Sequence, residues 1–294
     1  MLAFSNDDGT YSEVLVDSSP QILRLEQDYS GRSLLPTDPV VGFIDHLIED
    51  YGDEWVTKIM YHYRWHHLYV DAIAKAGNML PLMSDNQMNV EQHVEIKDFI
   101  TTRQMNRTGL VGSTDGNRHV IEDSFIRLLR TLEAHLTDHQ FLLGRRPGRG
   151  DFGLFGQFSQ LFFWEPDSSL IAARRSPRSV IWAYQVDDLS SLEIGETDGW
   201  FTRDKLPESL LGLLSEIGRT YAPFLIANEQ AIEAGNPELS CLIEGREYKQ
   251  APFAYQNKCL GWIREAFRQL SADNQDAVTQ ILGGTGCEVL IPDV

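Results

Sequence analysis

The feature that most constrains the fold is the stretch 141–158, which reads FLLGRRPGRGDFGLFGQF. A short apolar run is followed by three glycines and a proline within 144–150, which interrupt any regular element. After this break, phenylalanines recur three and four positions apart, the spacing of one buried helix face. They are Phe152, Phe155, Phe158 and Phe162. We therefore predict a buried core helix over 150–163.

The start of this helix carries its own signals. Gly148 is placed as the N-cap, and Asp151 becomes the third helical residue. There the carboxylate can accept hydrogen bonds from the free N–H groups of the first turn and face the positive end of the helix dipole. We predict a structural role for both residues. The neighbouring arginines, Arg145, Arg146 and Arg149, are expected in a solvated loop.

This stretch resembles the glutathione S-transferase family, in which an FLLG…P…AD…G segment leads into the core helix of an all-helical C-terminal domain. The match lies in Phe141, Leu142, Leu143, Gly144, Pro147, Asp151 and Phe152. The sequence departs from the family at Gly148, where Ser or Thr is usual, and at Gly150, where Ala is usual. We expect these departures to cost a few tenths of a kcal/mol and about 1 kcal/mol, which weakens the helix without abolishing it.

The N-terminal residues predict a hairpin followed by a helix. Apolar segments at 2–5 and 11–16 flank Asn6-Asp-Asp-Gly9, a strong hairpin turn. Ser18 and Gln21 have the spacing of a capping box, and Ser30-Gly31 ends the helix. This order looks like the last part of the thioredoxin-like domain that begins glutathione transferases. The resemblance implies a preceding βαβ unit, which the sequence does not contain, so we expect either an upstream start or loss of that half.

The predicted fold is mainly α, a partial thioredoxin-like α/β domain followed by an all-α bundle of the glutathione transferase C-terminal type. We place the first domain at 1–30, a linker at 31–39, the helical domain at 40–235 and an extension at 236–294. A hairpin is predicted around Glu244-Gly245. Helical periodicity covers 40–76, 86–106, 118–138, 177–190, 206–234 with a kink at Pro223, 254–271 and 273–282.

Charge and cysteine usage exclude several classes. A net charge of −18 argues against nucleic acid or an anionic membrane as the main partner. No apolar run approaches the roughly 20 residues of a membrane span, and the N-terminus does not read as a signal peptide. Cys241, Cys259 and Cys287 are odd in number and lack a C-x-x-C spacing. They predict reduced thiols in a cytoplasmic protein, with Cys259 buried and inert.

Asp17-Ser18 is the leading candidate site. A serine hydroxyl and free N–H groups at a helix N-terminus form a pocket for a carboxylate. The resemblance implies that Ser18 holds the α-carboxylate of the γ-glutamyl residue of glutathione, and that Asp17 helps to hold its amine. The alternative is that Ser18 only caps its helix. The family activates the thiol with a Tyr, Ser or Cys near its first strand, which this sequence lacks, so the catalytic residue is unknown.

The aromatic segment 55–69 is the second candidate site. The resemblance implies that the first helix of the C-terminal domain lines the pocket for the electrophile, and Tyr61, Arg64, Trp65 and Leu68 lie on adjoining turns there. The alternative is that they are core residues. The pairs His62/His66 and His135/His139 have metal-ligand spacing, but neither shows a third ligand, so no metal is predicted.

The resemblance implies a glutathione transferase-like enzyme that binds glutathione as its substrate and adds the thiolate to small hydrophobic electrophiles. The alternative is a non-catalytic binding or structural protein of the same fold. A homodimer is expected from the family.

Overall fold

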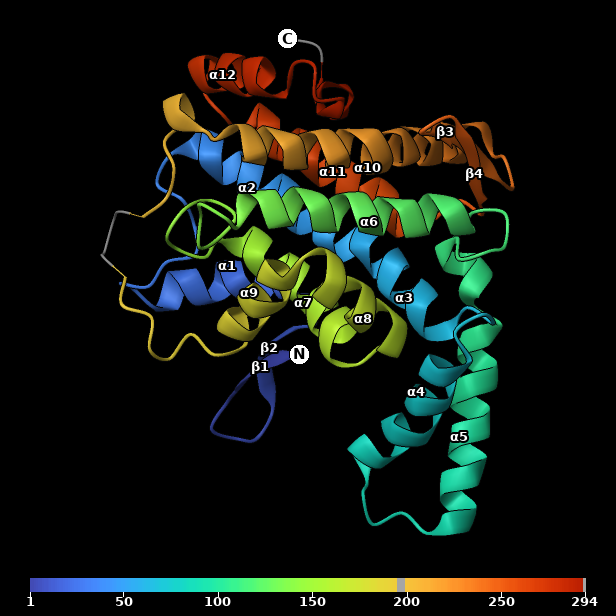
Figure 1. Ribbon diagram of the computed structural model, residues 1–294. Coiled ribbons are helices and arrows are strands. Elements are labelled where there is room, and N and C mark those ends of the chain that lie inside the picture. The colour runs from blue at the N-terminus through green and yellow to red at the C-terminus, as the bar shows by residue number, and fades with distance from the viewer. Residues whose placement is uncertain (195–198, 293–294) are drawn as a thin grey trace.

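The computed structural model of the protein describes residues 1–194 and 199–292, and it is mainly helical, as predicted (Figure 1). The last two residues of the predicted extension 236–294 lie outside this range. The strands are β1 (Leu2–Ser5), β2 (Tyr11–Leu15), β3 (Leu239–Ile243) and β4 (Arg246–Gln250). The helices are α1 (Ser18–Asp28), α2 (Pro39–Tyr51), α3 (Thr57–Trp65), α4 (Val70–Ser84), α5 (Val90–Met105), α6 (Arg118–His135), α7 (Arg149–Phe163), α8 (Pro166–Arg175), α9 (Pro177–Asp187), α10 (Glu208–Ala234), α11 (Ala254–Arg268) and α12 (Ala272–Leu282).

Two antiparallel hairpins form at the turns that the sequence indicates. β1 pairs with β2, and Gly9 between them takes a left-handed φ of 81°. β3 pairs with β4 across Glu244 and Gly245, whose φ angles are 51° and 73°. Left-handed angles at both central residues match the twist of the flanking strands, which explains why a two-residue turn suffices.

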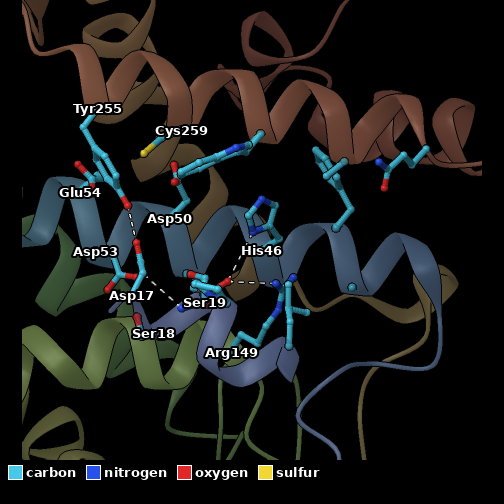
Figure 2. Close-up of a pocket in the computed structure, with 18 of the residues that line it drawn as sticks. Asp17, Ser18, Ser19, His46, Asp50, Asp53, Glu54, Arg149, Tyr255 and Cys259 are labelled. Atoms are coloured by element: carbon cyan, nitrogen blue, oxygen red, sulfur yellow. Dashed lines mark hydrogen bonds and ion pairs between the residues drawn. The ribbon is translucent and has the colours of Figure 1, made fainter. Parts of the chain in front are cut away.

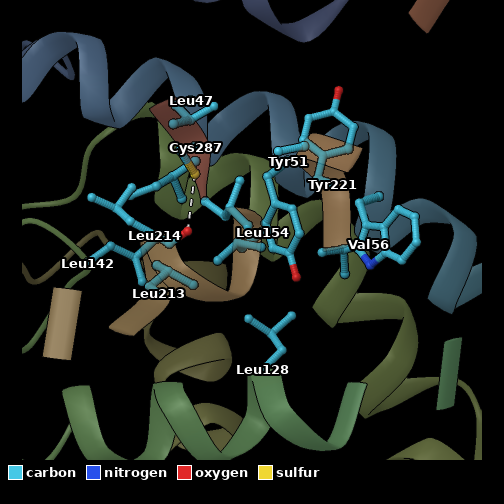
Figure 3. Close-up of a cluster of buried hydrophobic side chains, with 14 of the residues drawn as sticks. Leu47, Tyr51, Val56, Leu128, Leu142, Leu154, Leu213, Leu214, Tyr221 and Cys287 are labelled. Carbon is cyan, nitrogen blue, oxygen red and sulfur yellow. Dashed lines mark hydrogen bonds between the residues drawn. The ribbon is translucent and has the colours of Figure 1, made fainter. Parts of the chain in front are cut away.

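One hydrophobic core runs from Val40 to Ile291. Leu47, Leu128, Leu154 and Leu214 bring α2, α6, α7 and α10 together in it (Figure 3). The C-terminal elements belong to the same core. Phe43 of α2 packs edge-on against Phe267 of α11 at 5.9 Å between ring centroids, and the buried Cys287 thiol donates to the carbonyl of Leu214 at 3.1 Å.

Glycines allow α2 and α7 to touch backbone to backbone. A Cβ added at Gly153 would lie 2.9 Å from the carbonyl oxygen of Glu49, and one at Gly52 would lie 2.7 Å from the carbonyl carbon of Gly153. At this crossing the chain passes from α2 through a π-helical turn, Gly52–Val56, into α3. Such turns insert one extra residue into a helix and recur at functional sites.

Several predicted boundaries were wrong. The helix predicted over 40–76 is interrupted, because α3 ends at Trp65 and α4 begins only at Val70. Helix α8, which begins at Pro166, was not predicted. In the core helix α7, Phe158 and Phe162 are buried as expected, whereas Phe152 and Phe155 are only half-buried.

α4 and α5 project from the body as a helical pair, called the arm here (Figure 1). Gly77 allows the two helices to approach, since a Cβ there would lie 2.6 Å from the Thr101 hydroxyl. No side chain of α5 is buried. The arm exposes the apolar side chains of Val70, Met79, Met83, Val90, Val94 and Phe99. None of the helices in the described residues is long and apolar enough to cross a membrane.

Candidate functional site

Two buried carboxylates organise the N-terminus of α7. Gly148 is the N-cap, and Asp151 accepts hydrogen bonds from the N–H of Gly148 at 3.0 Å, the N–H of Leu142 at 3.1 Å and the indole of Trp182 at 3.2 Å. Asp45 of α2 accepts from the next two backbone N–H groups, at 2.9 and 2.8 Å. Burial raises the pKa of Asp151 to about 7, while its N–H donors act in the opposite direction.

Asp45 and Ile48 leave little room for a side chain at positions 148 and 150. A Cβ at position 148 would lie 2.6 Å from the Asp45 carboxylate, and one at position 150 would lie 2.9 Å from Ile48. A larger residue at either position would force Asp45 or Ile48 to shift. A carboxylate from α2, that of Asp45, accepts from the first-turn N–H groups of α7, where a Ser or Thr hydroxyl was expected.

The arginines around this cap are not all solvated, contrary to expectation. Arg145 is exposed, but Arg146 is buried, stacks over Trp200 at 4.1 Å and donates to the carbonyl of Ser33 at 2.8 Å. Arg149 is also buried and forms an ion pair with Glu49 at 3.2 Å. Arg149 therefore connects the helix cap to the neighbouring cavity.

A cavity of about 970 Å³ lies where the β2–α1 connection meets α2 and α11 (Figure 2). We call it the acidic pocket, because the carboxylates of Asp17, Asp50, Asp53 and Glu54 gather at one end of it, while aromatic and aliphatic side chains complete its lining. The polar lining includes Asp17, Ser18, Ser19, His46, Glu49, Asp50, Asp53, Glu54, Arg149 and Tyr255. The apolar lining includes Val16, Leu23, Phe43, Trp262, Ala266 and Leu270.

The predicted pair Asp17-Ser18 lies at this pocket, and the alternative that Ser18 caps its helix is wrong. Asp17, not Ser18, is the N-cap of α1, and its carboxylate accepts from the N–H of Ser19 at 3.3 Å and from the Tyr255 hydroxyl. The predicted capping box does not form, because the Gln21 amide donates instead to the carbonyl of Leu15 at 3.1 Å. Ser18 is exposed as the first helical residue, so its hydroxyl is available to a ligand.

The π-helical turn supplies the carboxylates at the floor of the pocket. Burial, followed by repulsion from Glu49 and Asp17, raises the pKa of Asp53 to about 8. Burial also raises the pKa of Glu54 to about 7, against a hydrogen bond from Gln256. Carboxyls that share a desolvated site resist ionising together, and a cation placed between them would relieve that cost.

The pocket's thiol and phenol are both held protonated. Burial and the nearby carboxylates of Asp50 and Glu54 raise the pKa of Cys259. Burial and the hydrogen bond to Asp17 raise the pKa of Tyr255. Neither the Cys259 thiol nor the Tyr255 hydroxyl therefore has the lowered pKa of an activated nucleophile.

The second predicted set is only partly near this site. Tyr61 donates to Gln104 at 2.8 Å and lines a smaller cavity of about 410 Å³, which shares Asp53, Glu54 and Tyr255 with the acidic pocket.

The other three members of that set lie apart. Arg64 forms a buried ion pair with Glu165, Trp65 is buried in the body, and Leu68 is exposed. They do not form one wall, because α3 ends at Trp65 and leaves Leu68 on the following turn.

The carboxylates of the π-helical turn were missed from the sequence. The signal is IEDYGDEW, residues 48–55, where pairs of acids four positions apart lie on one helix face within an apolar run. Lys58 was also missed. It is buried and donates to Gln250 at 2.9 Å, and burial lowers its pKa to about 7.

No family model matches the sequence, and neither a curated protein nor a solved structure matches it.

Proposed function

We propose that this protein is glutathione transferase-like and that the acidic pocket binds glutathione beside a small hydrophobic compound. The observation that carries the proposal is the position of the Asp17-Ser18 turn. It opens into a cavity of about 970 Å³ that has a charged end and an apolar wall, as a ligand with a polar and a hydrophobic part requires.

The charged end suits the γ-glutamyl group of glutathione, which is a zwitterion. Its ammonium group would lie among the carboxylates of Asp17, Asp53 and Glu54, whose mutual repulsion it would reduce. Its α-carboxylate would accept from the exposed hydroxyl of Ser18. The Arg149 guanidinium at the same pocket supplies a positive charge, although Glu49 already neutralises part of it.

The apolar wall suits the second ligand. Phe43, Trp262 and Leu270 line the pocket, and the half-exposed Trp262 packs edge-on against Tyr255 at 5.8 Å between ring centroids. An aromatic or aliphatic electrophile would bury its surface there, at about 25 cal/mol for each Å² removed from water.

A non-catalytic binding protein of the same kind is the second candidate, and one observation favours it over an enzyme. A thiolate needs a hydrogen-bond donor or a cation beside it, whereas the Tyr255 hydroxyl donates to Asp17 and the Cys259 thiol has a raised pKa. We therefore expect glutathione binding with weak or no conjugation. Rapid conjugation of a chloronitrobenzene substrate would instead support the enzyme.

Calorimetric titration of reduced glutathione tests the proposal. Ser18→Ala should weaken binding by roughly tenfold or more, as expected for one lost hydrogen bond to a charged group. Ser190→Ala, at an exposed serine outside the pocket, should leave affinity unchanged. Equal affinity of the wild type and Ser18→Ala would contradict the assigned role of Ser18. Binding of phenethylamine without binding of glutathione would keep the pocket and refute its proposed ligand.

The proposal includes a cytoplasmic homodimer. Cys241, Cys259 and Cys287 are all free thiols, which supports a reducing compartment. The exposed apolar side chains of the arm supply a surface that a second copy would cover.

A further inference from the structure

A second cluster of ligand-type side chains lies away from the acidic pocket, at the end of α3. His66 and His67 follow the last residue of the helix, and Asp115 lies in the loop before α6. A carboxylate oxygen of Asp115 lies 3.3 Å from Nε2 of His66 and 3.6 Å from Nε2 of His67. The three donor atoms all lie within 4.8 Å of one another.

The end of α3 makes this arrangement possible. Adjacent residues in a continuous helix point about 100° apart and cannot share one ligand. His66 instead has extended backbone angles, φ −68° and ψ 135°, and its carbonyl accepts from the N–H of Tyr69 in a tight turn. The two imidazole rings therefore lie nearly side by side, 4.4 Å between centroids and tilted by 32°.

The loop that carries Asp115 is fixed on both sides. Before it, the buried Ser113 hydroxyl lies 2.8 Å from Nδ1 of His62. After it, the buried Asn117 side chain donates to the carbonyl of Lys249 at 2.7 Å and accepts from its N–H at 3.0 Å. The backbone on either side of Asp115 is therefore held in place before any ligand binds.

We propose that His66, His67 and Asp115 form a binding site for a divalent transition metal, with Zn²⁺ as the best match. Zinc takes imidazole nitrogen and carboxylate oxygen at about 2.0–2.2 Å in tetrahedral geometry, so its donors lie roughly 3.3–3.5 Å apart. The two measured nitrogen–oxygen distances are close to this range. His67 and Asp115 are exposed, so their side chains can rotate to close the third separation.

The fourth ligand position would be taken by water. Buried His66 supplies the fixed ligand, and its burial favours the neutral imidazole that a metal requires. His62, which has metal-ligand spacing to His66 in the sequence, does not join the site, because it contacts Ser113 and Glu122 instead. Asp115 is the third ligand that the sequence did not indicate, and it comes from a loop far along the chain.

Zinc titration of the tag-free full-length protein tests the site, with a chromophoric chelator as competitor. The wild type should bind one Zn²⁺ per chain at micromolar concentration and unfold at a higher temperature when zinc is present. His67→Ala and Asp115→Asn should each weaken binding by roughly tenfold or more. Both residues are exposed, so neither change should prevent folding.

His139→Ala is the matched control, because it removes a histidine of the other pair that has metal-ligand spacing in the sequence. It should leave zinc affinity unchanged, and Co²⁺ in the wild type should give a visible absorption band that the two ligand variants lack. Absence of stoichiometric zinc binding would overturn the site. Binding that persists in both ligand variants, or that is lost equally in His139→Ala, would overturn it as well.

Discussion

Asp45 and Asp151 together accept hydrogen bonds from four backbone N–H groups around the start of α7. Both side chains are fully buried, so water cannot replace a lost partner. An N–H group left unsatisfied in such a place costs about 1–3 kcal/mol. At the scale of single residues, the junction of α2 and α7 therefore depends on these two carboxylates.

Asp151→Ala should lower the free energy of unfolding by about 2 kcal/mol or more, because it leaves buried donors unsatisfied. Asp167→Ala is the control, since Asp167 is an exposed acid in the first turn of α8. It should change stability by about 0.5 kcal/mol or less. Chemical denaturation of both variants checks the difference, and equal effects would contradict the role assigned to Asp151.

The raised pKa of Asp53, about 8, predicts a pH dependence. Between about pH 4 and pH 8 the folded chain holds a proton on Asp53 that the unfolded chain has released, so this group's contribution to stability falls as the pH rises. Asp53→Asn removes that loss. Relative to the wild type, the variant should gain up to about 1.4 kcal/mol of stability per pH unit between pH 5 and 8.

Urea unfolding of the wild type and Asp53→Asn at several pH values measures this gain. Asp98→Asn, at an exposed position of the arm, should run parallel to the wild type. If the free energy of unfolding of Asp53→Asn followed that of the wild type at every pH, the pKa of Asp53 would not be raised in the folded protein, and this prediction would be wrong.

At the scale of elements, the contact of α2 with α7 depends on two glycines facing each other. Gly153 lies against the backbone of Glu49, and Gly52 lies against the backbone of Gly153. The same crossing holds the π-helical turn that carries Asp53 and Glu54 into the acidic pocket. A wider crossing would therefore alter both the core and the pocket.

Gly153→Ala should destabilise the protein by several kcal/mol, because its Cβ would meet backbone atoms of α2 at 2.9–3.0 Å. Gly156→Ala lies in the same helix with no atom within 4 Å of the added Cβ. It should be neutral or stabilise by up to about 1 kcal/mol. Thermal unfolding distinguishes the two, and similar melting temperatures for both variants would refute the close crossing.

How far the sequence predicted these elements depended on whether the signal was local. Both hairpins and the start of α7 follow from local turn and cap residues, and they were predicted. The break after Trp65 was not, since the turn 66–69 contains no glycine or proline. The Asp45 cap and the His66–Asp115 approach join residues far apart in the chain, so no local pattern indicates them.

At the scale of the whole molecule, polar contacts attach the start of α1 to the body. α1 has no buried residue, while Ser19 donates to Glu49 at 2.9 Å and the Tyr255 hydroxyl donates to Asp17. These contacts form one side of the acidic pocket. The arm leaves the body elsewhere and exposes its own apolar surface.

A homodimer through the arm predicts a native mass twice the 33.4 kDa of one chain in light scattering at micromolar concentration. Phe99→Glu should shift the protein toward monomer, because it places a charge in the apolar surface. Leu242→Glu, at an exposed apolar position of β3, is the control and should leave the mass unchanged. A wild-type monomer would contradict the proposed dimer.

The central claim is that the acidic pocket binds glutathione at the start of α1, and nuclear magnetic resonance of the ¹⁵N-labelled protein tests it most directly. Titration with reduced glutathione should shift the amide signals of Ser18 and Ser19, and the indole signal of Trp262 should shift when a hydrophobic electrophile analogue is added. The indole signal of Trp182, buried beside Asp151, should stay in place. Saturating glutathione that leaves the Ser18 and Ser19 signals unchanged would contradict the claim.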